Sequence, residues 1–357
     1  MISSILSTSR AILYDRPAQA EQTSLFEVRK AESNDVLQIP ALFEEVYGGS
    51  YGNPGVYSAE YLTERMSRGE LVSIVAVARD NRVIGHCALV KDNSHARIAH
   101  VAMSVVSSVF RNIGCESRML AAVIQEARKG CLWGIASQSV THHVFAQKAG
   151  QKFGFKRIGL QVGIVSERRM YDGYHPAPGR RQSVAIGYLP LREGPKTAMY
   201  PPCHHRDFID MLFKEVGLKR SLASPEVRND QSSIGRTSIK LRTITHDVAQ
   251  ITIDSYGTAI FRCIAELVQD LKARDTRYIS MELPLGSPFT ATACQEFEQL
   301  GFFISGIMPH SSIGDALVLQ YNNNAQVDYD DISAASETLA AVKSYVLSHD
   351  PNRRNKN

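Results

Sequence analysis

The sequence predicts a mixed α/β protein of two domains, each a mostly antiparallel mixed sheet with helices packed against it. The chain of 357 residues is too long for one ordinary domain and fits two of common size. β-rich runs alternate with amphipathic helical patterns along most of its length, which is typical of mixed α/β layers. The order of strands and helices in the first part of the chain also returns in the second.

The first domain is expected over residues 26–168, after a flexible N-terminal arm of residues 1–25 that lacks periodicity. Alternating hydrophobicity, helix caps and turn residues predict its elements. In chain order these are strand 26–31, helices 33–49 and 58–69, a hairpin of strands 71–80 and 83–92, strand 96–110, helix 116–130, strand 132–140, helix 141–155 and a strand pair within 156–167.

A connector rich in proline and glycine is expected over residues 169–235, with one helix at 207–218. The second domain is expected over residues 236–345, followed by a solvated tail of residues 346–357. Its predicted elements are strands 236–244 and 249–255, helix 258–275, strand 277–285, helix 291–302 and closing strands 303–309 and 315–321.

The two domains share a short sequence pattern as well as an outline. The segments QKFGFKRIG and EQLGFFISG each join a helix to a strand, and superposing them aligns Gly154 with Gly301 and Gly159 with Gly306. This favours an internal duplication. The alternative is that a glycine and an aromatic residue commonly end a helix before a strand.

The composition argues against several classes of protein. Hydrophobic residues make up 44% of the chain and charged residues 21%, as in globular proteins. The net charge of +4 is small and the basic residues are scattered, so we expect no nucleic-acid partner. No apolar run approaches the roughly 20 residues that cross a bilayer, so no membrane interaction is expected. Six separated cysteines and no secretion signal indicate free thiols and a cytoplasmic location.

The most informative segment is the passage from strand 96–110 into helix 116–130. Five consecutive backbone N–H groups lie at the expected helix start, those of Asn112, Ile113, Gly114, Cys115 and Glu116. Unpaired amides and the helix dipole both favour an anion such as a pyrophosphate, and Arg111 adds a charged donor. Taken alone, the same residues also suit an ordinary strand-to-helix turn.

This loop and its surroundings resemble the GNAT superfamily of N-acetyltransferases, which bind acetyl-coenzyme A through an Arg/Gln-x-x-Gly-x-Gly/Ala loop. Arg111 and Gly114 match that pattern, and Glu116 stands at the place of the last small residue. Residues 141–155 resemble the second cofactor motif of the family, with His143 in place of asparagine and Ala146 matching the alanine. The resemblance covers residues 26–167 and, more weakly, residues 237–321.

The resemblance implies how acetyl-CoA, or another acyl-CoA, would bind. Main-chain groups of Val105, Val106 and Ser107 would pair with the pantetheine arm, and residues 111–116, together with His143 and Ala146, would contact the rest of the cofactor. The backbone amide of Val106 would stabilise the oxyanion.

The resemblance also implies where the acceptor would react. His100 stands near the acidic residue of the family and is the expected base; a half-buried strand histidine with no catalytic role is the alternative. Gly150 stands where the family often has a tyrosine that protonates the thiolate, so another acid, or water, must act. Tyr47 and Tyr51, in the loop expected over the acceptor pocket, and Glu282, on a predicted buried strand, are candidate substrate contacts.

Two further groups of residues carry weaker expectations. Cys203, His204 and His205 are consecutive and cannot all converge on one ion, and no second ligand pair has zinc-site spacing, so no metal is predicted. Cys115, at a helix start, is expected to have a lowered pKa and to be sensitive to oxidation rather than catalytic.

The predicted function is transfer of an acetyl or other short acyl group from coenzyme A to a primary amine of a small molecule or amino acid. Two alternatives stay open. One is transfer of a long acyl chain from coenzyme A or an acyl carrier protein, and the other is a non-catalytic scaffold that senses acyl-CoA or binds a partner. The sequence does not decide the oligomeric state.

Overall fold

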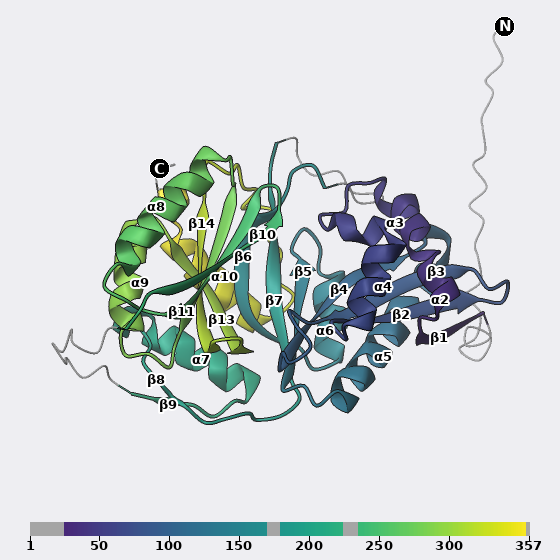
Figure 1. The fold of residues 1–357 in the computed structure, drawn as a ribbon, viewed down its shortest axis with the longest axis horizontal. Helices are drawn as coiled ribbons and strands as arrows, with labels where there is room; N and C mark the ends of the chain where they lie inside the picture. Colours follow the sequence, from purple (N-terminus) through teal and green to yellow (C-terminus); the bar gives the residue numbers. More distant parts are fainter. Residues whose placement is uncertain (1–24, 170–178, 224–234, 355–357) are drawn as a thin grey trace, which may run out of the picture.

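The computed structural model describes residues 25–169, 179–223 and 235–354. Apart from Leu25, the N-terminal arm predicted for residues 1–25 lies outside these ranges. The described chain forms one twisted sheet of twelve strands with helices on both faces, so the mixed α/β class is confirmed (Figure 1). The two sheets expected from the sequence are therefore joined into one.

The N-terminal half follows the predicted order closely. Its elements are β1 (Phe26–Lys30), α2 (Ser33–Val36), α3 (Ile39–Tyr47), η1 (Pro54–Tyr57), α4 (Ala59–Ser67), β2 (Leu71–Ala78), β3 (Val83–Val90), β4 (Ile98–Val106), η2 (Ser108–Phe110), α5 (Cys115–Lys129), β5 (Gly134–Val140), α6 (Phe145–Lys152), β6 (Lys156–Val165) and β7 (Gln182–Pro190). One predicted helix is split into α2 and α3, because Pro40 lacks the N–H that a continuous helix would need.

The C-terminal half and the segment that leads to it contain the remaining elements. These are β8 (Ala198–Met199), η3 (Cys203–His205), α7 (Arg206–Val216), β9 (Ser221–Leu222), β10 (Ser238–Thr245), β11 (Val248–Ser255), α8 (Ile260–Ala273), β12 (Tyr278–Pro284), α9 (Thr290–Gln299), β13 (Phe303–Ser311), β14 (Gly314–Asn322), α10 (Glu337–His349) and α11 (Pro351–Arg354).

Two expectations about these regions are wrong. The strand pair predicted within residues 156–167 is the single strand β6, and its partner β7 lies in the supposed connector. Because β7 is a central strand with both faces buried, its sequence lacks the alternation of polar and apolar residues that would indicate a strand. The expected tail begins inside α10, whose N-terminus is capped by the Ser336 side chain.

The order of strands is symmetric about the central pair, β6 and β13. It is β1-β2-β3-β4-β5-β7-β6-β13-β14-β12-β11-β10, with β6 and β13 as the central neighbours. On the outer side of each lies an antiparallel partner, β7 beside β6 and β14 beside β13. The next strands outward are β5 and β12. Beyond these, β4 pairs with β5 in parallel, as β11 does with β12. Figure 1 shows β6 and β7 between the purple and blue N-terminal end and the green C-terminal end.

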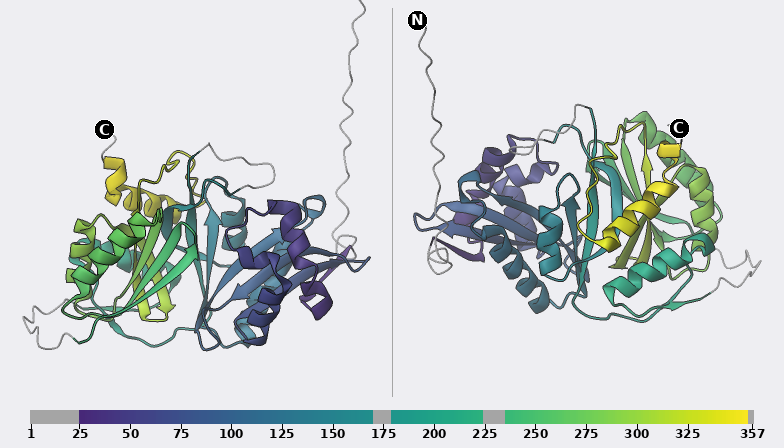
Figure 2. Two further views of the ribbon diagram at one scale, coloured as in Figure 1. Left: turned by 45° about the horizontal axis from the view of Figure 1, so that its top comes forward. Right: turned by 180° about the vertical axis from the view of Figure 1, so that it is seen from behind.

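Helices bury both faces of the sheet. In the N-terminal half, α5 covers one face and α3 and α4 cover the other, each burying its own apolar cluster. Seen from behind, α7 and α10 lie across the middle strands, where both contact β6 and β13 (Figure 2). Within the described ranges, no helix is both long and apolar enough to cross a membrane.

Candidate functional site

Strands β4 and β5 separate part-way along their length. Their parallel register runs from Ile98 opposite Gly134 to Val101 opposite Ser137 and then stops, although β4 continues to Val106 and β5 to Val140. Beyond Ser137, β5 stays paired to β7 on its other edge. The edges of β4 and β5 that face each other beyond this point form no ladder, so their main-chain hydrogen-bonding groups are not paired with one another; the space between these two edges is called the groove.

A buried histidine supports the bend of β4 beside this groove. Met103 has a φ of +53°, and the register of β4 with β3 shifts around it, as at a β-bulge. His86 of β3 is fully buried and joins the Met103 carbonyl oxygen through Nδ1, at 2.8 Å, to the Ser73 hydroxyl through Nε2, at 3.1 Å. Burial lowers the pKa of His86 to about 4, which keeps the ring neutral. No local sequence pattern singles out His86.

The register of β4 decides which main-chain groups reach the groove. The Ser107 amide donates to the Ile84 carbonyl at 2.9 Å, on the β3 side. Since N–H groups alternate between the two edges of a strand, those of Val106 and Ser104 point toward β5 and that of Val105 points toward β3. Of the three predicted main-chain contacts, only Val106 therefore presents its amide to the groove, and Ser104 joins it.

The side chain of Ser107 is occupied as well. Its hydroxyl donates to the Glu45 carboxylate of α3 at 2.7 Å. Ser107 thus fastens the end of β4 to β3 and α3 and offers no donor to a ligand.

The loop before α5 presents a row of amides to solvent. In the parts of the chain that the structure describes, no protein acceptor pairs with the N–H groups of residues 112–116, and the first bond of the helix is from the Arg118 amide to the Gly114 carbonyl. Gly114 is the N-cap of α5 with a φ of +83°, and a Cβ there would meet nothing within 4 Å. Arg111, Asn112 and Glu116 are exposed around it. These features fit a bound pyrophosphate.

The Cys115 thiol faces the protein interior and not the loop. A Cβ on Gly85 would lie 2.9 Å from its sulfur, and only 2% of Cys115 is exposed. Burial raises the pKa of this thiol to about 12, so the expected lowered pKa and oxidation sensitivity are wrong.

The second predicted cofactor motif surrounds the start of α6. His143 precedes this helix, and its ring lies 4.4 Å from that of His142 and 5.3 Å from that of Phe145. Its Nδ1 atom is buried and has no hydrogen-bond partner among the described residues. Ala146 is half-buried on α6. An orphaned polar atom here fits a ligand that lies along the N-terminal end of this helix.

An arginine fills the space that Gly150 leaves. A Cβ on Gly150 would lie 3.3 Å from Nη2 of Arg157, which donates to the Gln147 carbonyl at 2.5 Å. Nη1 lies 3.0 Å from the Cβ position of Gly187, where Ser137 Oγ lies at 2.6 Å. Arg157 and Ser137 therefore border the same space over Gly187, the register partner of Ser137.

This arginine is almost fully buried, with 2% of it exposed. Its Nε and Nη1 atoms have no hydrogen-bond partner within the described chain. Burial lowers the pKa of the guanidinium to about 10, so it remains a cation at neutral pH. The sequence contains no local signal for it, because Gly150 and Arg157 meet only through the packing of α6 on β6.

His100 lies on the face of the sheet opposite α5. It pairs with Val90 and Ala136 on the neighbouring strands and shares its face with Ala102, which packs under α3 and α4. Burial lowers the pKa of His100, Asp92 raises it, and Arg242 lowers it. Arg242, on β10 of the C-terminal half, bonds Asp92 at 2.5 Å.

Glu282 of β12 belongs to the same electrostatic neighbourhood. It accepts a hydrogen bond from Gln250 at 2.9 Å. Burial, followed by the charge of Asp92, raises the pKa of Glu282 to about 7, against the opposing effect of Arg242. His100 of the N-terminal half and Glu282 of the C-terminal half thus share the same charged neighbours, Asp92 and Arg242.

The segment that contains Tyr47 and Tyr51, called the tyrosine loop, also contacts the C-terminal half. The Arg169 guanidinium lies 4.5 Å from the Tyr51 ring and 5.7 Å from the Tyr47 ring. A Cβ on Gly52 would lie 3.7 Å from the Thr245 side chain of β10. Strand β10 therefore runs past both the tyrosine loop and Asp92.

The structure brings two further residues with metal-binding atoms to the histidine pair that the sequence singles out. Cys203 is exposed and apart, but α9 brings Cys294 and Glu298 to His204 and His205, so these histidines do meet a second pair of ligand-type residues. The four residues lie apart from the groove, on η3 and α9.

Residues 53–163 match the model of a family described as an acetyltransferase (GNAT) domain. The match includes β2 to β5, the loop before α5, α6 and most of β6. Residues 53–163 of the 357-residue chain are therefore similar to a GNAT acetyltransferase domain. Among curated proteins, none matches the chain.

The structure is also similar to solved acetyltransferase structures. A GNAT superfamily phosphinothricin acetyltransferase from Sinorhizobium meliloti, in complex with AcCoA, is 16% identical with a TM-score of 0.39, covering 48% of this chain and 90% of that one. An N-acetyltransferase from Staphylococcus aureus Mu50 is 17% identical with a TM-score of 0.38, covering 47% and 99%. The spermidine/spermine N-acetyltransferase of Vibrio cholerae is 17% identical with a TM-score of 0.37, covering 47% and 95%.

Proposed function

We propose that the protein is an N-acyltransferase that moves an acetyl or other short acyl group from coenzyme A to a primary amine of a small molecule or amino acid. One observation carries the proposal. The unpaired amides before α5 and the gap between β4 and β5 lie at successive points along one strand, inside the matched domain. A ligand with a diphosphate followed by an extended, hydrogen-bonding arm suits this arrangement.

Each part of the groove has a separate binding role. The amides of residues 112–116 and Arg111 hold the diphosphate, and the inward-facing main chain of Ser104 and Val106 pairs with the extended arm. His143 Nδ1 and Ala146 contact the ligand from the side of α6. The bound thioester supplies an activated acyl carbonyl at the point where the strands separate.

The reaction forms a C–N bond and breaks a C–S bond, so a proton must leave the amine and one must reach the sulfur. His100 lies on the acceptor face, and its lowered pKa leaves its ring neutral and able to take the proton from the amine. The Val106 amide, which points into the groove, donates to the carbonyl oxygen.

Arg157 takes the part that a tyrosine at position 150 would play. It comes from the opposite face to His100, borders the same space over Gly187 as Ser137, and has two nitrogens without a protein partner in the described chain. A buried guanidinium at this point stabilises the departing thiolate by charge and hydrogen bonding. The sulfur then gains its proton from solvent as the product leaves.

The C-terminal half serves as part of the acceptor site in this proposal. Its strand order mirrors that of the N-terminal half, which supports a tandem form in which the second copy is degenerate. After β11, this half has Tyr256 and Gly257 with no adjacent arginine where a phosphate loop would lie. Glu282 and Arg242 instead face the acceptor side of the first half, and a half-titrated Glu282 attracts an ammonium.

The proposal is tested by titrating the protein with acetyl-CoA and with longer acyl-CoA forms in a thermal-shift assay, and by measuring thiol release with a panel of amines. We expect stabilisation by acetyl-CoA and amine-dependent release of thiol. Stronger stabilisation by long acyl chains would favour the long-chain acyltransferase. Binding without turnover across the panel would favour the non-catalytic scaffold, and no binding of any acyl-CoA would overturn the proposal.

A further inference from the structure

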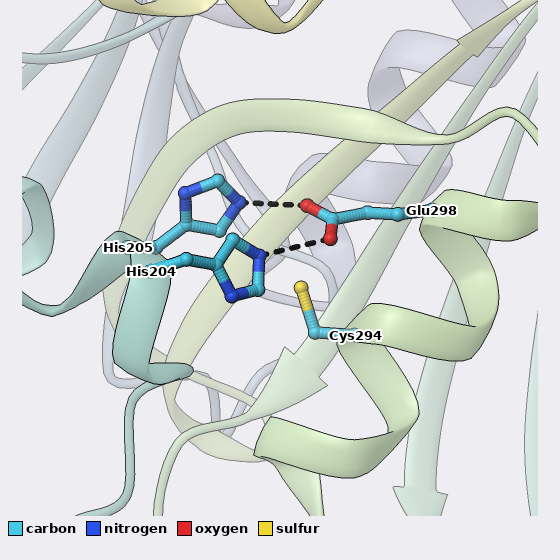
Figure 3. Close-up of side chains that lie close together, drawn as sticks. All are labelled: His204, His205, Cys294 and Glu298. Atoms are coloured by element: carbon cyan, nitrogen blue, oxygen red, sulfur yellow. Dashed lines mark hydrogen bonds and ion pairs between the residues drawn. The ribbon is translucent and has the colours of Figure 1, made fainter.

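Four side chains with metal-binding atoms meet where the segment between the halves packs against the C-terminal half (Figure 3). His204 and His205 belong to η3, and Cys294 and Glu298 lie one turn apart on the same face of α9. One ligand atom of each residue lies within 4.8 Å of all the others. The side chains of His205 and Cys294 are fully buried, whereas 37% of His204 and 24% of Glu298 are exposed.

The hydroxyl of Tyr345, on α10, contacts both His205 and the main chain of His204. The Tyr345 hydroxyl donates its single proton to the His204 carbonyl at 3.1 Å. While the hydroxyl donates to this carbonyl, the same oxygen, 2.8 Å from Nδ1 of His205, can only accept there, and Nδ1 carries a hydrogen. Nε2 of a neutral His205 is therefore a lone pair, and it points at the ligand cluster.

That lone pair faces another acceptor. His205 Nε2 lies 2.7 Å from one oxygen of Glu298, and His204 Nε2 lies 2.9 Å from the other. Both Nε2 atoms lie at hydrogen-bond distance from the carboxylate, so either ring protons or a metal ion can join the two histidines to Glu298. The buried Cys294 thiol faces the same carboxylate, so a sulfur ligand joins the two imidazole nitrogens and the carboxylate oxygens at this point.

We propose that these four residues bind one zinc-type divalent ion. Two imidazole nitrogens, one thiolate and one carboxylate are ligands that Zn²⁺ prefers, and the two anionic ligands neutralise its charge. Bonds of about 2.0 Å to N and O and about 2.3 Å to S place tetrahedral ligands about 3.3–3.6 Å apart. When the ion binds, the distances from the histidine Nε2 atoms to the Glu298 oxygens, 2.9 and 2.7 Å, need to lengthen slightly. The longest distance between two ligand atoms, which is within 4.8 Å, needs to shorten.

The surroundings assign the ion a structural role. All four coordination positions are supplied by the protein, which is typical of structural zinc. Tyr345 orients one ligand through its second ring nitrogen, as outer-shell partners of zinc histidines do. The ion fastens η3 and the start of α7 to α9, beside α10. It is separate from the proposed acyl-transfer groove and does not depend on that function.

Cobalt provides the most direct test. The full-length protein is stripped with a chelator and titrated with Co²⁺, and thiolate-to-cobalt charge-transfer absorption is followed in the wild type, Cys294→Ser and Cys203→Ser. Cys203 is the matched control, since it is the neighbouring cysteine and lies outside the cluster. We expect about one equivalent of cobalt in the wild type and in Cys203→Ser, with the absorption band lost in Cys294→Ser.

A second measurement keeps the test valid if Cys294→Ser does not fold. Zinc content and melting temperature of the wild type are measured before and after chelation, and Glu298→Gln is measured beside it. We expect about one zinc per chain, a fall of several degrees in melting temperature on chelation, and at least tenfold weaker zinc binding in Glu298→Gln. A wild type that binds no stoichiometric zinc or cobalt, or equal loss of the cobalt band in both cysteine variants, would overturn the proposal.

Discussion

Gly159 of β6 and Gly306 of β13 lie opposite each other in the register that joins the two halves of the sheet. A Cβ on Gly306 would lie 2.1 Å from the Ile158 carbonyl oxygen, and one on Gly159 would lie 2.8 Å from that of Ser305. The same two glycines are equivalent in the repeated sequence pattern. A two-fold relation between duplicated halves would bring a residue near the axis against its own counterpart, which supports the tandem proposal.

The close contact between Gly159 and Gly306 gives the first prediction. Gly306→Ala should destabilise the protein by at least about 3 kcal/mol, because the main chain of β6 cannot move away without breaking the sheet. Gly314→Ala is the control, since it has a φ of +88° and open space around its Cβ position, and should cost about 1 kcal/mol. Denaturant unfolding measures both. Equal losses in the two variants would contradict the close-packing argument.

The loop before α5 gives the second prediction. Gly114→Val should abolish acyl-CoA binding, because a branched side chain would stand on the surface where the amides are presented. The residue also has to adopt a positive φ, which costs about 1–2 kcal/mol. Gly69→Val imposes a similar strain, at φ +67° after α4, again with open space. Calorimetric titration should show normal binding in Gly69→Val, and unchanged affinity in Gly114→Val would remove the phosphate assignment.

His100 gives the third prediction. His100→Ala should lower kcat by about a hundredfold or more at neutral pH and leave the acyl-CoA affinity unchanged. With a lowered pKa, the wild-type rate should rise with pH below 6.5 and then level off, and the variant should lose that rise. His95→Ala, in the exposed loop before β4, is the control. A pH–rate profile that His100→Ala leaves unaltered would reject the base.

Local pattern was enough for the elements and for the loop, but not for the contacts that complete the site. Residues 111–116 are contiguous, so a strand, a turn and a helix start could be recognised from spacing alone. Gly150 and Arg157, or His205 and Glu298, become neighbours only through packing between elements. α10 was missed because its buried residues include Leu339, Val342, Val346 and Leu347 within a largely apolar sequence with a weak polar face.

Arg157 gives the fourth prediction. Arg157→Met should lower kcat by about 10²–10³-fold, and the loss should shrink with acyl donors whose thiol is a better leaving group, because less charge then needs stabilising. Folding stability should stay level or rise, since an incompletely paired buried cation is replaced by an apolar side chain.

Rescue distinguishes this role from a structural one. Adding Gly150→Tyr to Arg157→Met places a phenol where the guanidinium had filled the space, and should recover part of the lost turnover. A loss of rate that is the same for all thiol leaving groups, together with a fall in stability, would assign Arg157 to packing alone.

Glu282 gives a prediction about stability and pH. Its pKa rises from 4.5 to about 7 on folding, so between these values the native state holds a proton that the unfolded chain releases. Stability must then fall as pH rises from about 4.5 to about 7. Glu282→Gln does not titrate, so its stability relative to the wild type should increase over this window, by up to about 3 kcal/mol at pH 8.

Urea unfolding at pH 5, 6, 7 and 8 measures this difference. Glu266→Gln, at a residue whose side chain is 71% exposed, is the control and should follow the wild type at every pH. Parallel curves for the wild type and Glu282→Gln would mean that Glu282 is ionised throughout. A permanently charged Glu282 would attract the acceptor ammonium equally at pH 5 and pH 8. In that case, titration of this carboxyl should not change the KM for the amine between these pH values.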